Sequence, residues 1–404
     1  MYIPRHLEAV VTEASAAFPV ILLTGPRQVG KTTMLKHLAS ANRKYVSLDN
    51  PLVRDLAVND PALFLQRYPP PLLIDEVQYA PQLLPYVKIY VDENKNNGDF
   101  WLTGSQMFYL MKNVTESLAG RVATLNMAGL SSDEINRAPA SMYKTDIAFL
   151  TEKAKLRKPG NLVEIYQRIW KGSMPALYET EHNVDLYYSS YVESYLKRDI
   201  KDLSQVGDEL MFMRFMTACA ARTGQMLNYA DLAKDVGISP PTAKQWLSIL
   251  VTSGIVFLLE PYFSNTLKRI IKAPNMYFMD TGLCAYLARW TQAEALEVSA
   301  MAGAFFETYI ISEIVKSYYN SGKKPALFYY RDTDGKEIDV IIEENNVLYP
   351  IEIKKSANPK KEFVRHFKVL EKTNKEVGPG NLICFVEELL PVDRQHHYVP
   401  AWLV

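Results

Sequence analysis

Short apolar runs alternate with amphipathic segments over the first third of the chain. Four of these runs have the length and apolar character of buried strands: Val20–Thr24, Tyr45–Leu48, Leu72–Asp75 and Phe100–Thr103. Strands that alternate with helices favour a parallel sheet covered by helices on both faces. The pattern therefore predicts an α/β domain at the N-terminus.

Beyond residue 150 the pattern changes. A charged stretch at 151–160 interrupts it, and residues 161–225 show apolar positions at helical spacing. Residues 226–290 have a helix–turn–helix rhythm followed by two strand-like runs, Ile255–Tyr262 and Ile270–Met279.

The last segment opens with a predicted helix at Ala302–Tyr318. The strand-like runs after it are Ala326–Tyr330, Ile338–Ile342, Leu348–Ile353 and Leu382–Val386. We therefore expect a second α/β region at the C-terminus.

Composition narrows the class of protein without naming a function. The 404 residues include 45 Lys and Arg against 45 Asp and Glu, so the formal net charge is zero, which excludes a uniformly basic surface. No apolar run approaches the ~18–20 residues that span a bilayer. Cys219, Cys284 and Cys384 lack both metal-ligand spacing and the even count of a disulfide framework. We expect a reduced, cytoplasmic protein with no membrane partner and no secretory signal.

The strongest motif is a glycine-rich loop that follows the first predicted strand. It fits G-x-x-x-x-G-K-[ST] through Gly25, Pro26, Arg27, Gln28, Val29, Gly30, Lys31 and Thr32, with Thr33 next. Backbone N–H groups of such a loop, and the helix N-terminus after it, favour phosphate. Lys31 is expected to bind the β- and γ-phosphates and Thr32 to hold Mg²⁺. The predicted cofactors are ATP and Mg²⁺; the alternative is a plain strand–turn–helix connection.

Two later strand ends supply candidate partners for this loop. Asp75 ends an apolar strand and is a candidate ligand of the ATP-bound Mg²⁺, while Glu76 is expected to polarise the attacking water. The next strand ends in small polar residues, of which Ser105 is the preferred γ-phosphate sensor, and a simple turn is the alternative. Arg121 is a candidate finger that reaches the phosphate of a neighbouring subunit, although any exposed arginine fits that description.

This order of motifs resembles the AAA+ ATPase superfamily. LLTGPRQVGKTT, LLIDEVQ, FWLTGSQ and ESLAGRV are similar to a prokaryotic ATPase family whose C-terminal half is known only as a domain of unknown function. The resemblance covers nearly the whole chain. It implies a P-loop domain, then helices, a winged helix and a restriction-endonuclease-like domain, in a homo-oligomer such as a hexameric ring. Within YVESYLKRDI, Arg198 is a candidate lid arginine, with a solvated helix face as the alternative.

Residues 226–290 carry the signals of a winged helix. Gly237 permits the tight turn, Ser239 can cap the next helix, and Pro240 suits its first turn. Side chains expected to face DNA are Thr242, Lys244, Gln245, Lys268, Arg269 and Lys272. Six basic and four acidic residues between 225 and 290 make a weak footprint for nucleic acid, so a protein-docking role stays open.

The C-terminal region carries a carboxylate and lysine pattern on two adjacent predicted strands. Asp339 opens the first, and Glu352 and Lys354 lie on one face of the second. Two carboxylates beside a lysine suit Mg²⁺-assisted phosphodiester hydrolysis, with Glu307 on the preceding helix as a third carboxylate. The pattern resembles the PD-(D/E)XK nuclease superfamily. A surface ion pair, or a nuclease fold that binds DNA without cutting, are the alternatives.

A basic stretch follows this motif. Residues 354–375 hold eight basic and two acidic residues, a net charge of +6. The spacing i, i+4, i+7, i+11 predicts one face of an α-helix that tracks phosphates: Lys361, Arg365, Lys368 and Lys372.

Together these observations predict the α/β fold class and four regions. They are an AAA+-type P-loop ATPase domain (1–150), a helical lid or linker (151–225), a winged helix-turn-helix (226–295) and a restriction-endonuclease-like domain (296–404). The expected enzyme is an ATPase coupled to a nuclease that acts on duplex, single-stranded or branched DNA in repair, recombination or defence. The alternative is a regulatory or scaffold ATPase whose C-terminal domain only binds DNA or protein.

Overall fold

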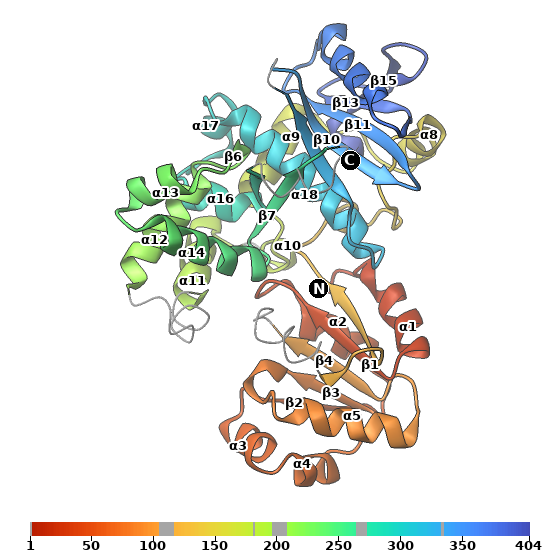
Figure 1. Cartoon of the computed structure of the whole chain (residues 1–404), viewed down its shortest axis with the longest axis vertical. Coiled ribbons are helices and arrows are strands. Elements are labelled where there is room, and N and C mark those ends of the chain that lie inside the picture. The colour runs from red at the N-terminus through yellow and green to blue at the C-terminus, as the bar shows by residue number, and fades with distance from the viewer. Residues whose placement is uncertain (1, 105–116, 181, 196–207, 264–272, 333–334) are drawn as a thin grey trace.

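A computed structural model describes residues 2–104, 117–180, 182–195, 208–263, 273–332 and 335–404. Figure 1 shows an N-terminal α/β body below a larger body, in which the helical region and the C-terminal sheet lie side by side. Within the described residues, no helix combines the length and the apolar character needed to cross a bilayer.

The N-terminal body is a parallel sheet with helices on both faces. As far as the described residues go, its strand order is β2-β3-β4-β1-β5, so β4 lies between β1 and β3. Its strands are β1 (Val20–Thr24), β2 (Lys44–Ser47), β3 (Leu72–Asp75), β4 (Phe100–Gly104) and β5 (Val122–Asn126). Its helices are α1 (Leu7–Ala17), α2 (Lys31–Leu38), α3 (Pro51–Asn59), α4 (Pro61–Arg67), η1 (Val77–Tyr79) and α5 (Leu83–Asn94).

Alternation along the strands divides the apolar side chains between two cores. Val20 and Leu22 pack with α3, α4 and α5, whereas Ile21 and Leu23 pack with α1 and α2. The second of these cores continues into the rest of the molecule. Among the described residues, the core beneath α1 and α2 is thus the one that is continuous with the rest of the molecule.

A run of helices connects the two bodies. They are α7 (Ser132–Ile135), α8 (Ile147–Lys155), α9 (Leu162–Lys171), α10 (Ala176–Glu179), α11 (Val184–Tyr195) and α12 (Glu209–Ala220). The predicted boundary at residue 150 falls inside α8, because two cations of the charged stretch are not solvated. Lys153 and Arg157 are both buried and form ion pairs with Asp133.

The next segment has the element order that a winged helix requires. It comprises β6 (Gln225–Met226), α13 (Tyr229–Val236), α14 (Pro240–Thr252), β7 (Val256–Pro261) and β8 (Asn275–Phe278). Two local predictions are confirmed: Gly237 ends α13 in the left-handed region (φ 82°), and the Ser239 side chain accepts the Thr242 N–H at 3.2 Å. The winged-helix assignment itself stays a prediction.

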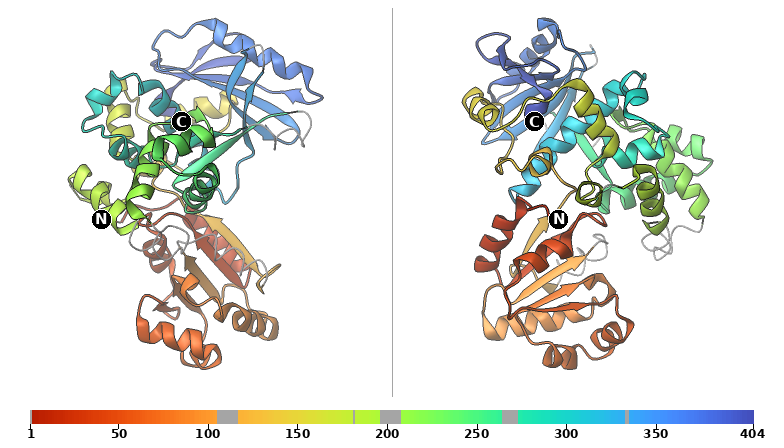
Figure 2. Two further views of the ribbon diagram at one scale, coloured as in Figure 1. Left: turned by 60° about the vertical axis from the view of Figure 1, so that its left-hand side comes forward. Right: turned by 180° about the vertical axis from the view of Figure 1, so that it is seen from behind.

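The C-terminal sheet is mixed and extends into the preceding segment. Its order is β14-β15-β13-β11-β10-β9-β7-β8-β6, with β12 beside β11, and β7 pairs with β9 in parallel. Its elements are α16 (Thr281–Leu287), α17 (Ala293–Glu297), α18 (Ala302–Asn320), β9 (Leu327–Arg331), β10 (Glu337–Glu344), β11 (Val347–Ile353), η3 (Lys361–Lys372), β12 (Glu376–Val377), β13 (Gly380–Cys384), β14 (Leu390–Pro391), β15 (His396–Pro400) and η4 (Ala401–Leu403). Figure 2 shows this sheet from two further sides. The predicted α/β fold class, with a parallel P-loop-type sheet followed by a mixed sheet, is confirmed.

Candidate nucleotide site and acid–lysine site

The glycine-rich loop connects β1 to α2 at the carboxyl end of the sheet. Gly25 has φ 147°, and a Cβ there would lie 2.0 Å from the Met127 carbonyl oxygen, so only glycine fits. Gly30 adopts the left-handed conformation (φ 92°) at the N-terminus of α2. The loop conformation therefore requires glycine at positions 25 and 30, the two glycines that the sequence motif contains.

Within this loop the buried Lys31 ammonium group holds two carbonyl oxygens. Its Nζ lies 2.9 Å from the Gly25 oxygen and 2.7 Å from the Pro26 oxygen. Arg27, Gln28, Thr33 and other loop residues line a cavity of about 510 Å³ together with Glu76 from the end of β3 and Ser194 from α11. Six of the nine predicted nucleotide-binding residues thus line one cavity: Arg27, Gln28, Gly30, Lys31, Thr32 and Thr33.

Asp75 is the centre of the polar contacts at the strand ends. Its Oδ1 accepts the Thr32 hydroxyl at 2.8 Å and also accepts the Thr103 hydroxyl, while its Oδ2 accepts Tyr45 Oη at 3.1 Å. Burial and the Asp75 charge raise the pKa of Tyr45 to about 12, which keeps this donor protonated. We call Asp75 and the hydroxyl groups that it accepts, those of Thr32, Thr103 and Tyr45, the nucleotide site. They fit Mg²⁺, which prefers oxygen ligands of this kind.

Glu76 follows Asp75 in a strained backbone conformation. Its φ of 56° lies in the left-handed region, which costs a residue with a side chain roughly 1–2 kcal/mol. Its side chain accepts the Gln78 amide at 2.6 Å and faces the cavity. Strain of this type concentrates at functional positions, and here it turns the carboxylate toward the glycine-rich loop.

Arg121 lies at the opposite end of the strands from the loop. It directly precedes β5, which runs parallel to β1, whereas the loop follows the end of β1. The Arg121 guanidinium group binds Asp92 on α5, with Nη2 3.0 Å from Oδ2. Arg121 therefore cannot serve its own subunit's loop. Ser105 and Arg198 lie outside the described residues.

Sequence reasoning missed Arg5, Tyr187 and the contacts that hold the loop from behind. The buried Arg5 donates Nη1 to the Val29 carbonyl at 2.7 Å, Nη2 to Ala128 at 2.8 Å, and Nε to Glu134 at 2.9 Å. Tyr187 on α11 donates to Gln28 Oε1 at 2.8 Å. These contacts join residues far apart in sequence, so no local spacing pattern predicts them.

The second cluster, which we call the acid–lysine site, lies at the hairpin of β10 and β11. Lys354 Nζ lies 2.7 Å from Glu352 Oε1 and 3.2 Å from Asp339 Oδ2, and the Ile353 N–H donates to Asp339 Oδ2 at 2.7 Å. The register of the β9–β10 pairing shifts between Ile338 and Ile341, the stretch that contains Asp339. The three predicted residues are therefore brought together.

Glu307, on α18, lies close enough to the acid–lysine site for the Asp339 charge to act on it, but its hydrogen-bond donor is a residue of β8. Its Oε1 accepts Tyr277 Oη from β8 at 2.6 Å, a partner that the sequence did not reveal. Burial, and then the Asp339 charge, raise the pKa of Glu307 and of Glu352 to about 8. Burial lowers the pKa of Lys354, yet the charges of Asp339 and Glu352 outweigh it, so that this pKa is raised.

The predicted nuclease Mg²⁺ site stays a prediction. In the described part of the chain, no three His, Cys, Asp or Glu side chains are grouped to hold a metal ion. The Lys354 ammonium group contacts both carboxylates instead. One feature favours a metal instead: among the residues that the structure describes, the buried Glu352 Oε2 has no hydrogen-bond partner.

The predicted basic face on one α-helix is wrong. Lys361–Lys372 form the 3₁₀ helix η3, in which Val364, Phe367 and Leu370 are buried at every third position. With three residues per turn, the four basic side chains do not share one face, although Arg365 and Lys368 do. Arg365 also lies beside Glu362 (3.7 Å). All four predicted cations are nevertheless exposed: Lys361, Arg365, Lys368 and Lys372.

The other predicted DNA contacts are only partly described. Lys244 and Gln245 are exposed on α14, and the Thr242 hydroxyl is hydrogen-bonded to Ser239 at 2.7 Å. Lys268, Arg269 and Lys272 lie outside the described residues.

Comparison with known proteins agrees with a P-loop ATPase domain at the N-terminus. Residues 17–136 match the model of an AAA domain, residues 163–294 a domain of unknown function (DUF8612), and residues 302–404 another (DUF4143). The N-terminal body is thus a domain of the P-loop ATPase type. The two matches that follow name no activity.

Whole-chain relatives add no function. Uncharacterized proteins of Mycobacterium tuberculosis and Mycobacterium bovis are each 29% identical over 359 residues, covering 88% of this chain and 74% of theirs. A Walker-type ATPase of Pyrococcus abyssi is similar over 70% of this chain and 94% of its own (15% identity, TM-score 0.44). A signal-transduction ATPase of Pyrococcus horikoshii with a tetratricopeptide-repeat sensor covers 79% and 47% (10% identity, TM-score 0.27). At these TM-scores neither structure supports a functional inference.

Proposed function

We propose that the chain hydrolyses ATP at the glycine-rich loop and transmits its nucleotide state to a C-terminal half that acts on DNA. The contact between this loop and the predicted winged helix carries the proposal. A Cβ at Gly254, between α14 and β7, would lie 3.0 Å from Cδ of Pro26 in the loop. Tyr195 on α11 also lies 3.0 Å from the Ser253 hydroxyl, beside Gly254. In this proposal, a displacement of the glycine-rich loop therefore changes the position of α14 and β7.

Residues of the glycine-rich loop and of the strand ends have the following roles in this proposal. Lys31 binds the β- and γ-phosphates after leaving the loop carbonyls, and Thr32 and Asp75 hold Mg²⁺, which offsets phosphate charge. Glu76 orients the attacking water. Arg121 reaches the phosphate of the next copy in an oligomer, since it faces away from its own loop.

For the C-terminal domain we propose DNA binding without cleavage. The Lys354 ion pairs to Asp339 and Glu352 support this version, because they satisfy the charges that a metal would need. The exposed cations of η3, together with Lys244, supply the phosphate contacts. A Mg²⁺-dependent nuclease is the second candidate, and the unpartnered Glu352 Oε2 favours it.

The ATPase assignment is tested by turnover of the full chain. Lys31→Ala and Glu76→Gln are expected to abolish ATP hydrolysis, whereas the exposed Glu93→Gln on α5 is expected to leave it unchanged. Substantial turnover in either site variant refutes the assignment.

The coupling is tested with two matched glycines. Gly254 (φ 73°) and Gly237 (φ 82°) have similar left-handed backbones, but a Cβ at Gly237 meets only the end of Met211, at 3.8 Å. Both alanine variants are expected to lose stability. Only Gly254→Ala is expected to shift the KM for ATP, by roughly tenfold. Equal KM values in the two variants contradict direct coupling.

The C-terminal role is tested by binding and cleavage assays in Mg²⁺ with duplex, single-stranded and four-way-junction DNA. Binding without product supports the non-cleaving version. Cleavage that disappears in Asp339→Ala while ATP turnover persists supports the nuclease. Absence of any DNA binding refutes both.

A further inference from the structure

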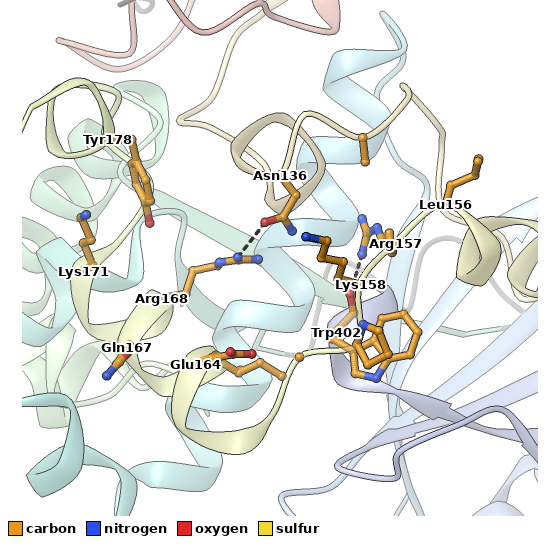
Figure 3. A pocket seen from close by; sticks show the side chains of 14 residues that line it. Asn136, Leu156, Arg157, Lys158, Glu164, Gln167, Arg168, Lys171, Tyr178 and Trp402 are labelled. Atoms are coloured by element: carbon orange, nitrogen blue, oxygen red, sulfur yellow. Dashed lines mark hydrogen bonds between the residues drawn. The ribbon is translucent and has the colours of Figure 1, made fainter.

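A second cavity, separate from the nucleotide site, lies where the connecting helices meet the C-terminal domain. It has a volume of about 700 Å³ and is lined by the α8–α9 connection, α9, the segment after α7 and Trp402 of η4. Figure 3 shows Lys158, Arg168 and Lys171 around it. This volume is within the range of pockets that bind nucleotide-sized ligands.

The charge of the lining is strongly positive. Arg157, Lys158, Arg168 and Lys171 all line the cavity, and Glu164 is the one acid among the fourteen lining residues. Glu164 Oε2 is already engaged, because it accepts the backbone N–H of Asn161 at 3.1 Å.

One of the four cations, Arg157, is paired with Asp133, whereas the other three have no carboxylate partner among the residues that the structure describes. Within the described part of the chain, Lys158, Arg168 and Lys171 form no ion pair with a carboxylate. Arg168 donates to two neutral oxygens, Ser132 Oγ at 2.6 Å and Asn136 Oδ1 at 3.1 Å, and Lys171 Nζ lies 4.5 Å from the Tyr178 ring centroid. Cations without a carboxylate ion-pair partner that line one cavity favour an anion.

Apolar and aromatic side chains share the walls with these cations. Leu156 has 63% of its surface exposed although it lines the cavity, and Tyr178 and Trp402 add aromatic rings. A phosphate group suits the cations, and a base or sugar suits the apolar walls.

We propose that this cavity binds a phosphate-bearing ligand of nucleotide size, supplied as a free nucleotide or as the phosphorylated end of a DNA or RNA strand. Occupancy is linked to the ATPase domain through Arg168. An anion that draws the Arg168 guanidinium group competes with its bonds to Ser132 and Asn136, which belong to the segment leading from β5.

The test uses the full chain with Lys31→Ala, which weakens binding at the glycine-rich loop. Calorimetric titrations use four probes: inorganic triphosphate, ADP, a 5′-phosphorylated ten-nucleotide single strand and the same strand without the phosphate. Lys158→Glu/Lys171→Glu is compared with Lys155→Glu/Lys324→Glu, which makes the same charge change at exposed lysines outside the cavity. Circular dichroism verifies folding. If the first pair fails to fold, Lys158→Glu alone replaces it, because Lys158 is exposed.

We expect binding of at least one phosphate-bearing probe, weakened ~100-fold by the cavity pair, at about tenfold per lost charge-assisted contact, and little changed by the control pair. Binding of ADP and triphosphate identifies a free nucleotide, and preference for the phosphorylated strand identifies a nucleic-acid end. Absence of binding, equal loss in both pairs, or equal binding of the two strands without binding of ADP or triphosphate overturns the proposal.

Discussion

Each of the two sheets carries a carboxylate site, but the carboxylates contact neutral hydroxyl groups in one sheet and an ammonium group in the other. At the nucleotide site, Asp75 accepts hydrogen bonds from the neutral hydroxyls of Thr32 and Thr103, so its charge remains available to a cation. At the acid–lysine site, the Lys354 ammonium group compensates Asp339 and Glu352 directly. The same residue types are thus prepared for a metal in one sheet and satisfied by the protein itself in the other.

The largest expected effect tests the first half of this comparison. Asp75→Asn keeps an oxygen that can accept the Thr32 and Thr103 hydroxyls but removes the charge that a cation needs. We expect ATP turnover to fall roughly 100-fold or more, with only a small change in melting temperature. Steady-state hydrolysis and thermal unfolding measure the two effects. A stable variant with normal turnover would contradict the role given to the charge.

The second prediction concerns the pH dependence of stability at the acid–lysine site. The pKa of Glu307 and of Glu352 is raised to about 8 in the folded chain, from an ordinary value of 4.5. Between these values the folded state holds protons that the unfolded state has released, so the free energy of unfolding falls as the pH rises from about 5 to 8. We expect a slope on the order of 1 kcal/mol per pH unit, measured by urea unfolding. Glu352→Gln should remove roughly half of the slope and leave the contribution of Glu307, and stability that rises over this range would be the opposite result.

Removal of the Lys354 charge is expected to lower the free energy of unfolding by somewhat less than the pH change does. Lys354→Met leaves Asp339 and Glu352 without their partner in a largely buried setting, and we expect a loss of roughly 2 kcal/mol at pH 8. Lys354→Arg retains the charge and serves as the control. Addition of Glu352→Gln to Lys354→Met should restore part of the loss. Unchanged stability of the single variant would remove the contrast between the two sites.

The smallest effects come from the two tyrosines that donate to carboxylates. Tyr277→Phe leaves the buried Glu307 Oε1 without its 2.6 Å donor and is expected to cost about 1 kcal/mol of stability. Tyr45 is 41% exposed, so Tyr45→Phe should change stability by less than ~0.5 kcal/mol and lower ATP turnover only a few-fold. Paired unfolding curves and hydrolysis rates distinguish the variants, and a reversed order of stability would contradict the burial argument.

The elements predicted best from the sequence are those whose apolar runs are continuous. Val20–Thr24 and Leu72–Asp75 coincide with β1 and β3, because inner strands of a parallel sheet are buried on both faces. The strand β5 was not predicted. It lies at the edge of the sheet, and most of its residues are only half-buried.

The site follows the same division between local and distant signals. The Thr32–Asp75 contact was predictable, because the loop motif and the strand end each carry a recognisable pattern. The contacts of Arg5 and Tyr187 with the loop depend on how distant elements pack, which no local pattern encodes. In η3 the charges have α-helical spacing while the buried Val364 and Phe367 follow a three-residue repeat, and burial determined the outcome.

The parallel pairing of β7 with β9 has a consequence for how the chain can be divided. Glu260 and Pro261 align with Phe328 and Tyr329, so the hairpin of the predicted winged helix and the C-terminal domain share one hydrogen-bonded ladder. A fragment that ends at residue 295 would leave β7 with a bare edge, which invites aggregation or exchange of strands between copies. Recombination that exchanges C-terminal halves between relatives should therefore tolerate a junction in the segment before α9 far better than one between β8 and β9.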